Sequence, residues 1–104
     1  MKLFRDRIKT DVPHLAIEIE HGPEGVLSIY IRISASKVFE TMEMDEADVF
    51  CDLDREGNLV GIEMINPGSV HFRKVLRKIA SKFNVTPLEN FLSEAKKYEQ
   101  VIHA

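Results

Sequence analysis

The chain has 104 residues, of which 44% are hydrophobic, and a formal net charge of −3 at pH 7. This length and apolar content suit one domain, and the acidic balance argues against a surface wholly devoted to nucleic acid, which needs a basic domain or stripe. The lone cysteine, Cys51, excludes an internal disulfide and a multi-cysteine zinc site, so we expect a reducing, cytoplasmic setting.

The N-terminal segment, residues 1–9, interrupts its apolar side chains with charges, and no later stretch reaches the roughly eighteen apolar residues of a membrane span. We therefore expect neither a signal peptide nor a membrane-spanning segment. From about residue 14 to 66 the dominant periodicity is two, in segments separated by turn residues, which predicts antiparallel strands. The predicted strands cover about 15–20, 27–34, 38–44, 49–53 and 59–65.

The last two predicted strands flank the turn Asp54-Arg55-Glu56-Gly57-Asn58. A hairpin loop of this length commonly ends in a residue with positive φ, a conformation that Gly57 adopts without a Cβ clash. The segment therefore predicts a β-hairpin.

Helical periodicity begins after this β-region. Apolar residues at helical spacing over 72–83 predict a first helix, with Ser69 as its N-cap and Asn84 as the residue that ends it. Residues 86–89, Thr-Pro-Leu-Glu, are typical of a capping box with proline at the first helical position, and they predict a second helix to about residue 101. The expected fold is α+β, an antiparallel β-meander of four to five strands (about 14–66) packed against a C-terminal two-helix hairpin (about 69–101).

The hairpin segment also matches the spacing of an EF-hand calcium loop. The metal-ligand candidates are Asp52, Asp54, Glu56 and Glu63, with Gly57 at the sharp turn and Asn58 at the carbonyl position. An EF-hand needs helices on both sides, whereas the flanking residues here are typical of strands. We therefore interpret the segment as a structural turn. The alternative is a metal-binding or hydrolytic protein that uses the carboxylates of Asp52, Asp54 and Glu63.

The remaining reactive side chains form no motif. The histidines share no spacing that brings them onto one metal ion, and they are His14, His21, His71 and His103. Cys51 lies in a strand pattern and is interpreted as a small buried hydrophobe; a Cys-His nucleophile pair would have His71 as its candidate base. We assign no catalytic residue and expect no cofactor.

Charge is unevenly distributed along the chain. Residues 40–63 hold nine carboxylates and one basic residue, a local balance of −8, whereas residues 71–82 hold five basic residues and no acid. The basic residues are Arg73, Lys74, Arg77, Lys78 and Lys82. They suit the solvated face of an amphipathic helix, or a contact surface for an acidic protein, for a second copy of the chain or for nucleic acid.

Three segments carry a family resemblance: Leu27-Ser-Ile-Tyr-Ile-Arg-Ile33, Val38-x-Glu-Thr-x-Glu43, and the hairpin pattern Asp52-x-Asp-x-x-Gly-x-x-x-Gly-Ile-Glu63. Through them, residues 26–68 resemble a widespread family of small β-rich proteins, domain of unknown function 2283. The resemblance implies a β-meander without an assigned activity, and the family is not a calcium-binding one. We predict a protein-interaction or self-association module without catalytic activity, with nucleic-acid binding through residues 73–82 as an alternative.

Overall fold

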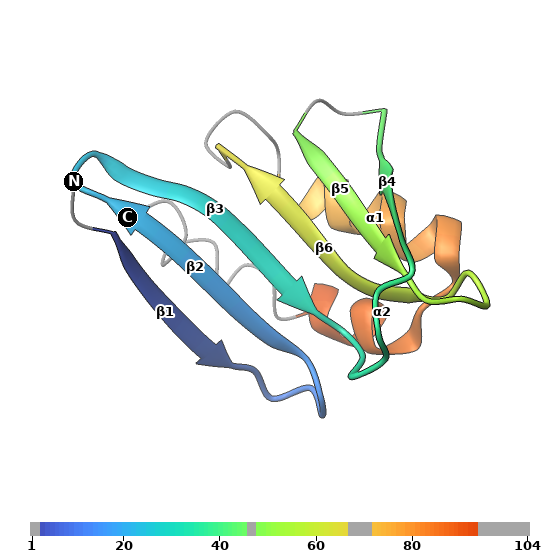
Figure 1. The fold of residues 1–104 in the computed structure, drawn as a ribbon. Coiled ribbons are helices and arrows are strands. Elements are labelled where there is room, and N and C mark those ends of the chain that lie inside the picture. The colour runs from blue at the N-terminus through green and yellow to red at the C-terminus, as the bar shows by residue number, and fades with distance from the viewer. Residues whose placement is uncertain (1–2, 46–47, 67–71, 94–104) are drawn as a thin grey trace.

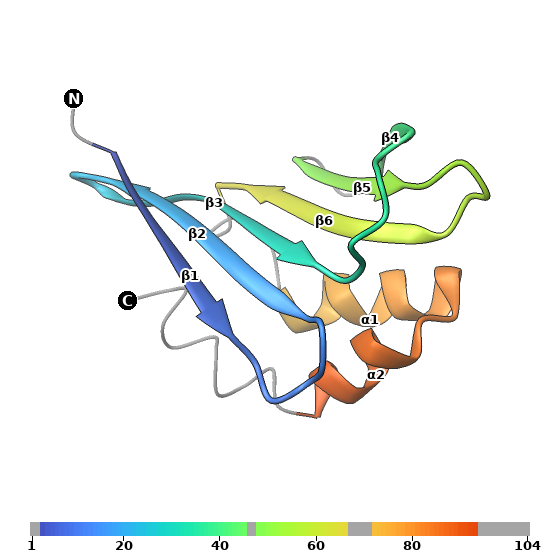
Figure 2. The ribbon, with the colours of Figure 1, turned by 60° about the horizontal axis from the view of Figure 1, so that its bottom comes forward.

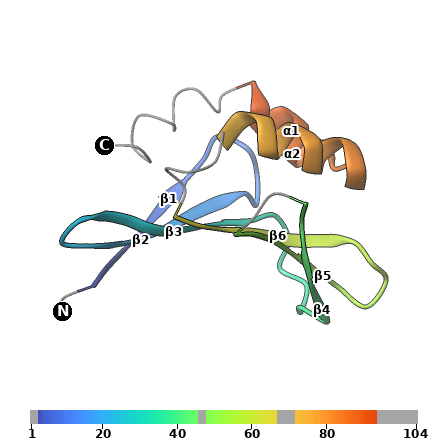
Figure 3. The same ribbon diagram turned by 90° about the horizontal axis from the view of Figure 1, so that it is seen from above.

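The computed structural model of the protein describes residues 3–45, 48–66 and 72–93. Its elements, in chain order, are β1 (Phe4–Lys9), β2 (Ala16–Gly22), β3 (Gly25–Arg32), β4 (Glu40–Glu43), β5 (Val49–Leu53), β6 (Leu59–Ile65), α1 (Phe72–Phe83) and α2 (Thr86–Leu92). The strands form one antiparallel sheet, and both helices lie on the same face of it (Figures 2 and 3). The architecture is α+β, as predicted.

The order of strands across the sheet is β1-β2-β3-β6-β5-β4 (Figure 1). The prediction of a meander of four to five strands is therefore wrong in two respects: the described sheet has six strands, and β3 pairs with β6 instead of β4. Two three-stranded meanders meet at the β3–β6 pair. The physical reason is burial, because β6 is almost wholly buried and needs neighbours on both sides, whereas the short, exposed β4 suits an edge.

Strand β1 was not predicted. Its sequence alternates basic residues with Phe4, Asp6 and Ile8, and five of its six residues are exposed, so it lacks the aliphatic face by which strands are recognised. Charged side chains of β1 instead pair with oppositely charged side chains of β2. Arg5 lies opposite Glu20 in the register, and its Nη2 atom is 3.0 Å from Glu20 Oε2. Charged side chains on an edge strand also discourage edge-to-edge pairing with other chains.

The core lies between the sheet and the helices. Strands β2, β3, β5 and β6 turn their alternate aliphatic residues to this side, and α1 adds one apolar stripe. Leu88 and Phe91 connect α2 to the same core. The rings of Phe72 and Phe91 pack edge to face with centroids 6.4 Å apart. Among the described residues, no helix has the length and hydrophobicity needed to cross a membrane.

The helix boundaries confirm some of the local signals and contradict one. Helix α1 covers residues 72–83, and Asn84 follows it with a φ of 52°, the left-handed conformation that ends a helix. The capping-box prediction is wrong. The N-cap of α2 is Val85, without a side-chain cap, and Thr86 is already helical, although a proline stands at the helix start as expected. Ser69 and the predicted extension of α2 beyond residue 93 lie outside the described residues.

Candidate functional site

The sheet face opposite the helices, called here the open face, carries a row of alternating carboxylates and aromatic rings. Register pairs place Glu18 beside Tyr30, Tyr30 beside Glu63, and Glu63 beside Phe50. Phe50 in turn lies opposite Glu43 on the edge strand β4. Because directly paired residues point to the same side of a sheet, these side chains form one row across five strands. This middle row comprises Glu18, Tyr30, Glu63, Phe50 and Glu43.

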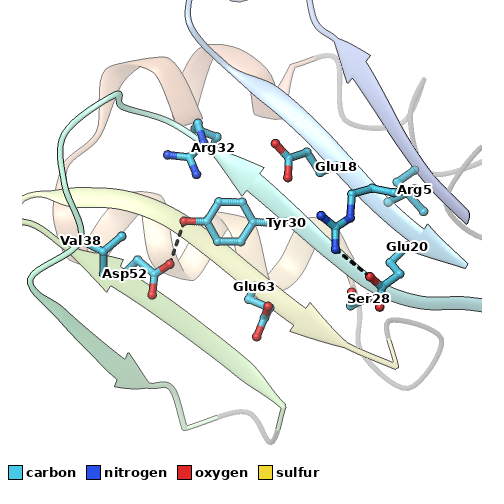
Figure 4. A pocket seen from close by; sticks show the side chains of 10 residues that line it. Arg5, Glu18, Glu20, Ser28, Tyr30, Arg32, Val38, Asp52 and Glu63 are labelled. Atoms are coloured by element: carbon cyan, nitrogen blue, oxygen red, sulfur yellow. Dashed lines mark hydrogen bonds and ion pairs between the residues drawn. The ribbon is translucent and has the colours of Figure 1, made fainter. Parts of the chain in front are cut away.

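From its place in the middle row, the Tyr30 side chain reaches across β6 to Asp52 on β5 (Figure 4). Its hydroxyl donates a hydrogen bond of 2.7 Å to Asp52 Oδ2, and the hydroxyl of Thr41 donates one of 2.6 Å to Asp52 Oδ1. The ring passes over Gly61, where a Cβ would overlap the Tyr30 Oη and Cζ atoms. Gly61 is therefore required by this close approach of a neighbouring side chain.

The Tyr30 hydroxyl is a hydrogen-bond donor that keeps its proton. Burial raises the pKa of Tyr30 well above its usual range, and the hydrogen bond to Asp52 and its negative charge raise it further. A tyrosine held in this state is unsuited to act as a base or a nucleophile at neutral pH. The arrangement anchors the Asp52 carboxylate and joins β3, β5 and β4 across β6.

A groove of about 420 Å³ runs along the open face beside Tyr30 (Figure 4). At one end Arg5 is paired with Glu20, and on the other side of the ring the guanidinium of Arg32 lies 5.4 Å from the Tyr30 ring centroid. The charged side chains that line the groove are Arg5, Arg32, Glu18, Glu20, Asp52 and Glu63. Four carboxylates against two guanidinium groups make it a polar, net acidic surface.

The hairpin turn uses Asp54 as a backbone cap. Asp54 Oδ1 accepts hydrogen bonds from the backbone N–H groups of Glu56, at 3.0 Å, and Asn58, at 2.9 Å. The carbonyl of Asp54 accepts the N–H of Gly57, whose φ is +83°. The backbone N–H of Asn58 holds the pKa of the Asp54 carboxyl below its usual value. These contacts account for the Asp, Gly and Asn of the EF-hand-like spacing as turn chemistry.

Replacing Asp54 by asparagine is expected to reduce stability in a pH-dependent way. The folded-state pKa of Asp54 lies below the ordinary value of 3.8, so its ionised form stabilises the folded state above that value. The advantage of the wild type over Asp54→Asn should be complete at neutral pH and disappear as pH falls through the depressed pKa. Urea unfolding of both proteins across this range measures it. A stability difference that does not vary with pH would contradict the assignment.

The structure separates the four metal-ligand candidates. Asp52 lies opposite Gly61 in the register and is bound by two hydroxyl groups, while Asp54 is turned into the loop. Glu63 stands one pair further along the same face, and Glu56 is exposed at the tip of the turn. Within the described part of the chain, no group of three or more His, Cys, Asp and Glu side chains is placed to hold a metal ion.

Cys51 is fully buried in β5, as predicted for a small hydrophobe. Burial raises the pKa of its thiol to about 11, with Lys82 opposing and Asp52 adding to the shift, so the thiolate needed for nucleophilic attack is scarce at neutral pH. His71, its candidate base, lies outside the described residues, as does His103. His21 contacts Asp6 at 2.6 Å near the edge of the sheet, and exposed His14 follows β1.

The five basic residues of α1 are all exposed. The helix buries Phe72, Val75, Leu76, Ile79 and Ala80. Lys74, Arg77 and Lys78 lie on the side away from this stripe, whereas Arg73 and Lys82 flank it. The helices lie on one face of the sheet (Figure 3). The residues of the middle row alternate along β2, β3, β5 and β6 with the buried residues that face the helices, so the row lies on the other face. The domain therefore presents a basic helix and a net acidic sheet surface in opposite directions.

Comparison with known protein families gives a match to the central strands of the sheet. Residues 28–66 match the family of proteins of unknown function called DUF2283. This match, which confirms the resemblance seen in the sequence, begins within β3, ends just after β6, and includes Tyr30, Asp52 and Gly61. The basic helix lies outside the matched residues. No curated protein and no solved structure matches the chain.

Asp52 and Glu63 were candidates from the sequence, but the roles of four other residues on this face were not predicted: Tyr30, Thr41, Glu18 and Phe50. Their association depends on strand register, which no local pattern reveals. One signal was present, because a glycine inside a strand pattern, here Gly61, often marks the close approach of another group.

Proposed function

We propose that this protein is a protein-interaction module whose principal contact surface is the basic face of α1. The observation that carries the proposal is the uniform charge of that helix, which holds five exposed basic residues and no acidic residue between Phe72 and Phe83. An ordinary solvated helix face intersperses charges of both signs, as i,i+4 pairs of opposite charge add stability.

The charge pattern of α1 is unfavourable for an isolated helix. Arg73 and Arg77 are four residues apart, as are Lys74 and Lys78, and Lys78 and Lys82. Each like-charge pair at this spacing costs about 0.2–0.5 kcal/mol. The first turn contains no acid, and Arg73 and Lys74 lie near the positive end of the helix dipole, where acidic side chains are preferred. An acidic surface that meets this face of the helix would offset the repulsion within these pairs.

Charge reversal tests the proposal. We expect Lys74→Glu/Arg77→Glu to reduce co-purification of its protein partner at least about tenfold, a loss of 1.4 kcal/mol in binding. The matched control, Lys9→Glu/Lys37→Glu, changes the same charge at two exposed sites outside the helix and should retain the partner. Affinity purification from the cells that make the protein, with quantitative mass spectrometry, measures the ratio.

Each purification is also treated with nuclease. If the wild-type protein retains the partner without nuclease and loses it after nuclease treatment, the basic face binds nucleic acid instead of protein. Equal recovery of all proteins by the helix variant and the control would show that α1 is not the contact surface.

A further inference from the structure

We propose that the open face of the sheet binds α1 of a second copy, so that the chain associates head to tail. This inference rests on the proposed function, because it takes α1 as a contact surface and names its partner. It is carried by charge complementarity between two surfaces of the same domain, the middle row and the basic face of α1.

The acceptor is the middle row. Its carboxylates at Glu18, Glu63 and Glu43 alternate with the rings of Tyr30 and Phe50. Carboxylates pair with guanidinium and ammonium groups, and aromatic faces attract the same cations, as the Arg32 guanidinium over the Tyr30 ring illustrates, so the row suits arginine and lysine. Spanning four strand spacings of about 4.8 Å, the row is about 19 Å long.

The donor matches this row in length and charge. With twelve residues, α1 is about 18 Å long. Lys74, Arg77 and Lys82 are exposed and distributed along that length. The complementarity is strongest over β6, β5 and β4, where the open face shows the carboxylates of Glu63, Asp52 and Glu43 without a basic residue. At the other end Arg7 faces Glu18, Arg5 is paired with Glu20, and the Arg32 guanidinium lies over the Tyr30 ring, which weakens the attraction there.

The positions of the two surfaces determine the type of assembly. A two-fold dimer uses the same patch on both copies, whereas here the donor and the acceptor are different surfaces on opposite faces. Each added copy therefore leaves one free acceptor and one free donor at the ends of the assembly. Such a contact is heterologous and continues unless its rotation closes a ring.

Two neutralised variants test this geometry. The first, Lys74→Gln/Arg77→Gln/Lys82→Gln, keeps only the acceptor, and the second, Glu18→Gln/Glu43→Gln/Glu63→Gln, keeps only the donor. Because glutamine preserves side-chain size at the carboxylate sites, the sheet should remain folded, which circular dichroism checks. Sedimentation velocity at low ionic strength should show concentration-dependent assembly of the wild type and monomers for each variant. Their mixture should form a heterodimer and stop at two copies.

A matched control separates the row from total charge. Glu24→Gln/Glu56→Gln/Glu89→Gln removes the same charge from exposed positions outside the row and should assemble like the wild type. Three results would overturn the inference: a wild type that stays monomeric, a wild-type assembly that stops at two copies, or a mixture without a heterodimer. A further combination is a wild type that is monomeric in sedimentation while the α1 variant loses a different protein partner in affinity purification. That combination would contradict this inference and support the proposed function.

Discussion

Replacing Gly61 by alanine is expected to lower the free energy of unfolding by about 1–3 kcal/mol, the range for inserting an atom into a packed site. The new Cβ would overlap the Tyr30 hydroxyl and ring, so the ring must leave its position over β6. Its 2.7 Å hydrogen bond to Asp52 would then break. The loss should therefore exceed the effect of an ordinary glycine substitution, and urea unfolding measures it.

The sign of the Gly61 effect should depend on Tyr30. In a Tyr30→Ala background the clash is absent, and Gly61→Ala should be neutral or stabilising by about 0.4–1 kcal/mol because alanine restricts the unfolded chain. Gly22→Ala is the matched control, since its Cβ would meet only the flexible side chains of Leu27, at 3.4 Å, and Leu3, at 3.8 Å. A loss of stability from Gly61→Ala that is the same with and without Tyr30 would show that the ring is not the cause.

Truncating Phe91 to alanine is expected to cost about 3–5 kcal/mol, the usual range for a fully buried phenylalanine. Its side chain has no exposed surface, and its ring packs edge to face on Phe72 of α1. The removal would leave a cavity between α2 and the rest of the core. The total free energy of unfolding of a small domain is only about 5–15 kcal/mol. The midpoints of thermal and urea unfolding should therefore fall by a large amount.

The Phe91 result also tests whether the helices and the sheet unfold together. If they share one cooperative core, far-ultraviolet circular dichroism and near-ultraviolet tyrosine absorbance should report one transition at a lower denaturant concentration. Phe39→Ala is the control, because Phe39 is 58% exposed and the guanidinium of Arg55 lies over its ring, 4.7 Å from the ring centroid. Phe39→Ala should lower the free energy of unfolding by only about 0.5–1 kcal/mol, the contribution of an exposed cation–π pair. A separate early transition for the helices in Phe91→Ala would indicate two cooperative units instead.

The local elements were largely predictable from the amino-acid sequence. Strands β5 and β6 have the boundaries expected from periodicity, α1 ends at the expected residue, and the Asp54–Asn58 turn closes the hairpin. These features depend on residues a few positions apart, whose alternation, spacing and backbone preferences act within one segment. The missed strand β1 has no aliphatic face, so its stability comes from pairing with β2 rather than from its own pattern.

The candidate site belongs to the tertiary structure. Tyr30 and Asp52 are 22 positions apart, and their hydrogen bond exists only because β6 lies between β3 and β5. A pattern of period two shows which residues share a face of one strand, but it contains nothing about which strand lies beside it. Strand order is decided by the burial of all the strands together. The same carboxylates that resemble an ion-binding loop in sequence thus become, in the sheet, a turn cap, a tyrosine anchor and part of an open acidic row.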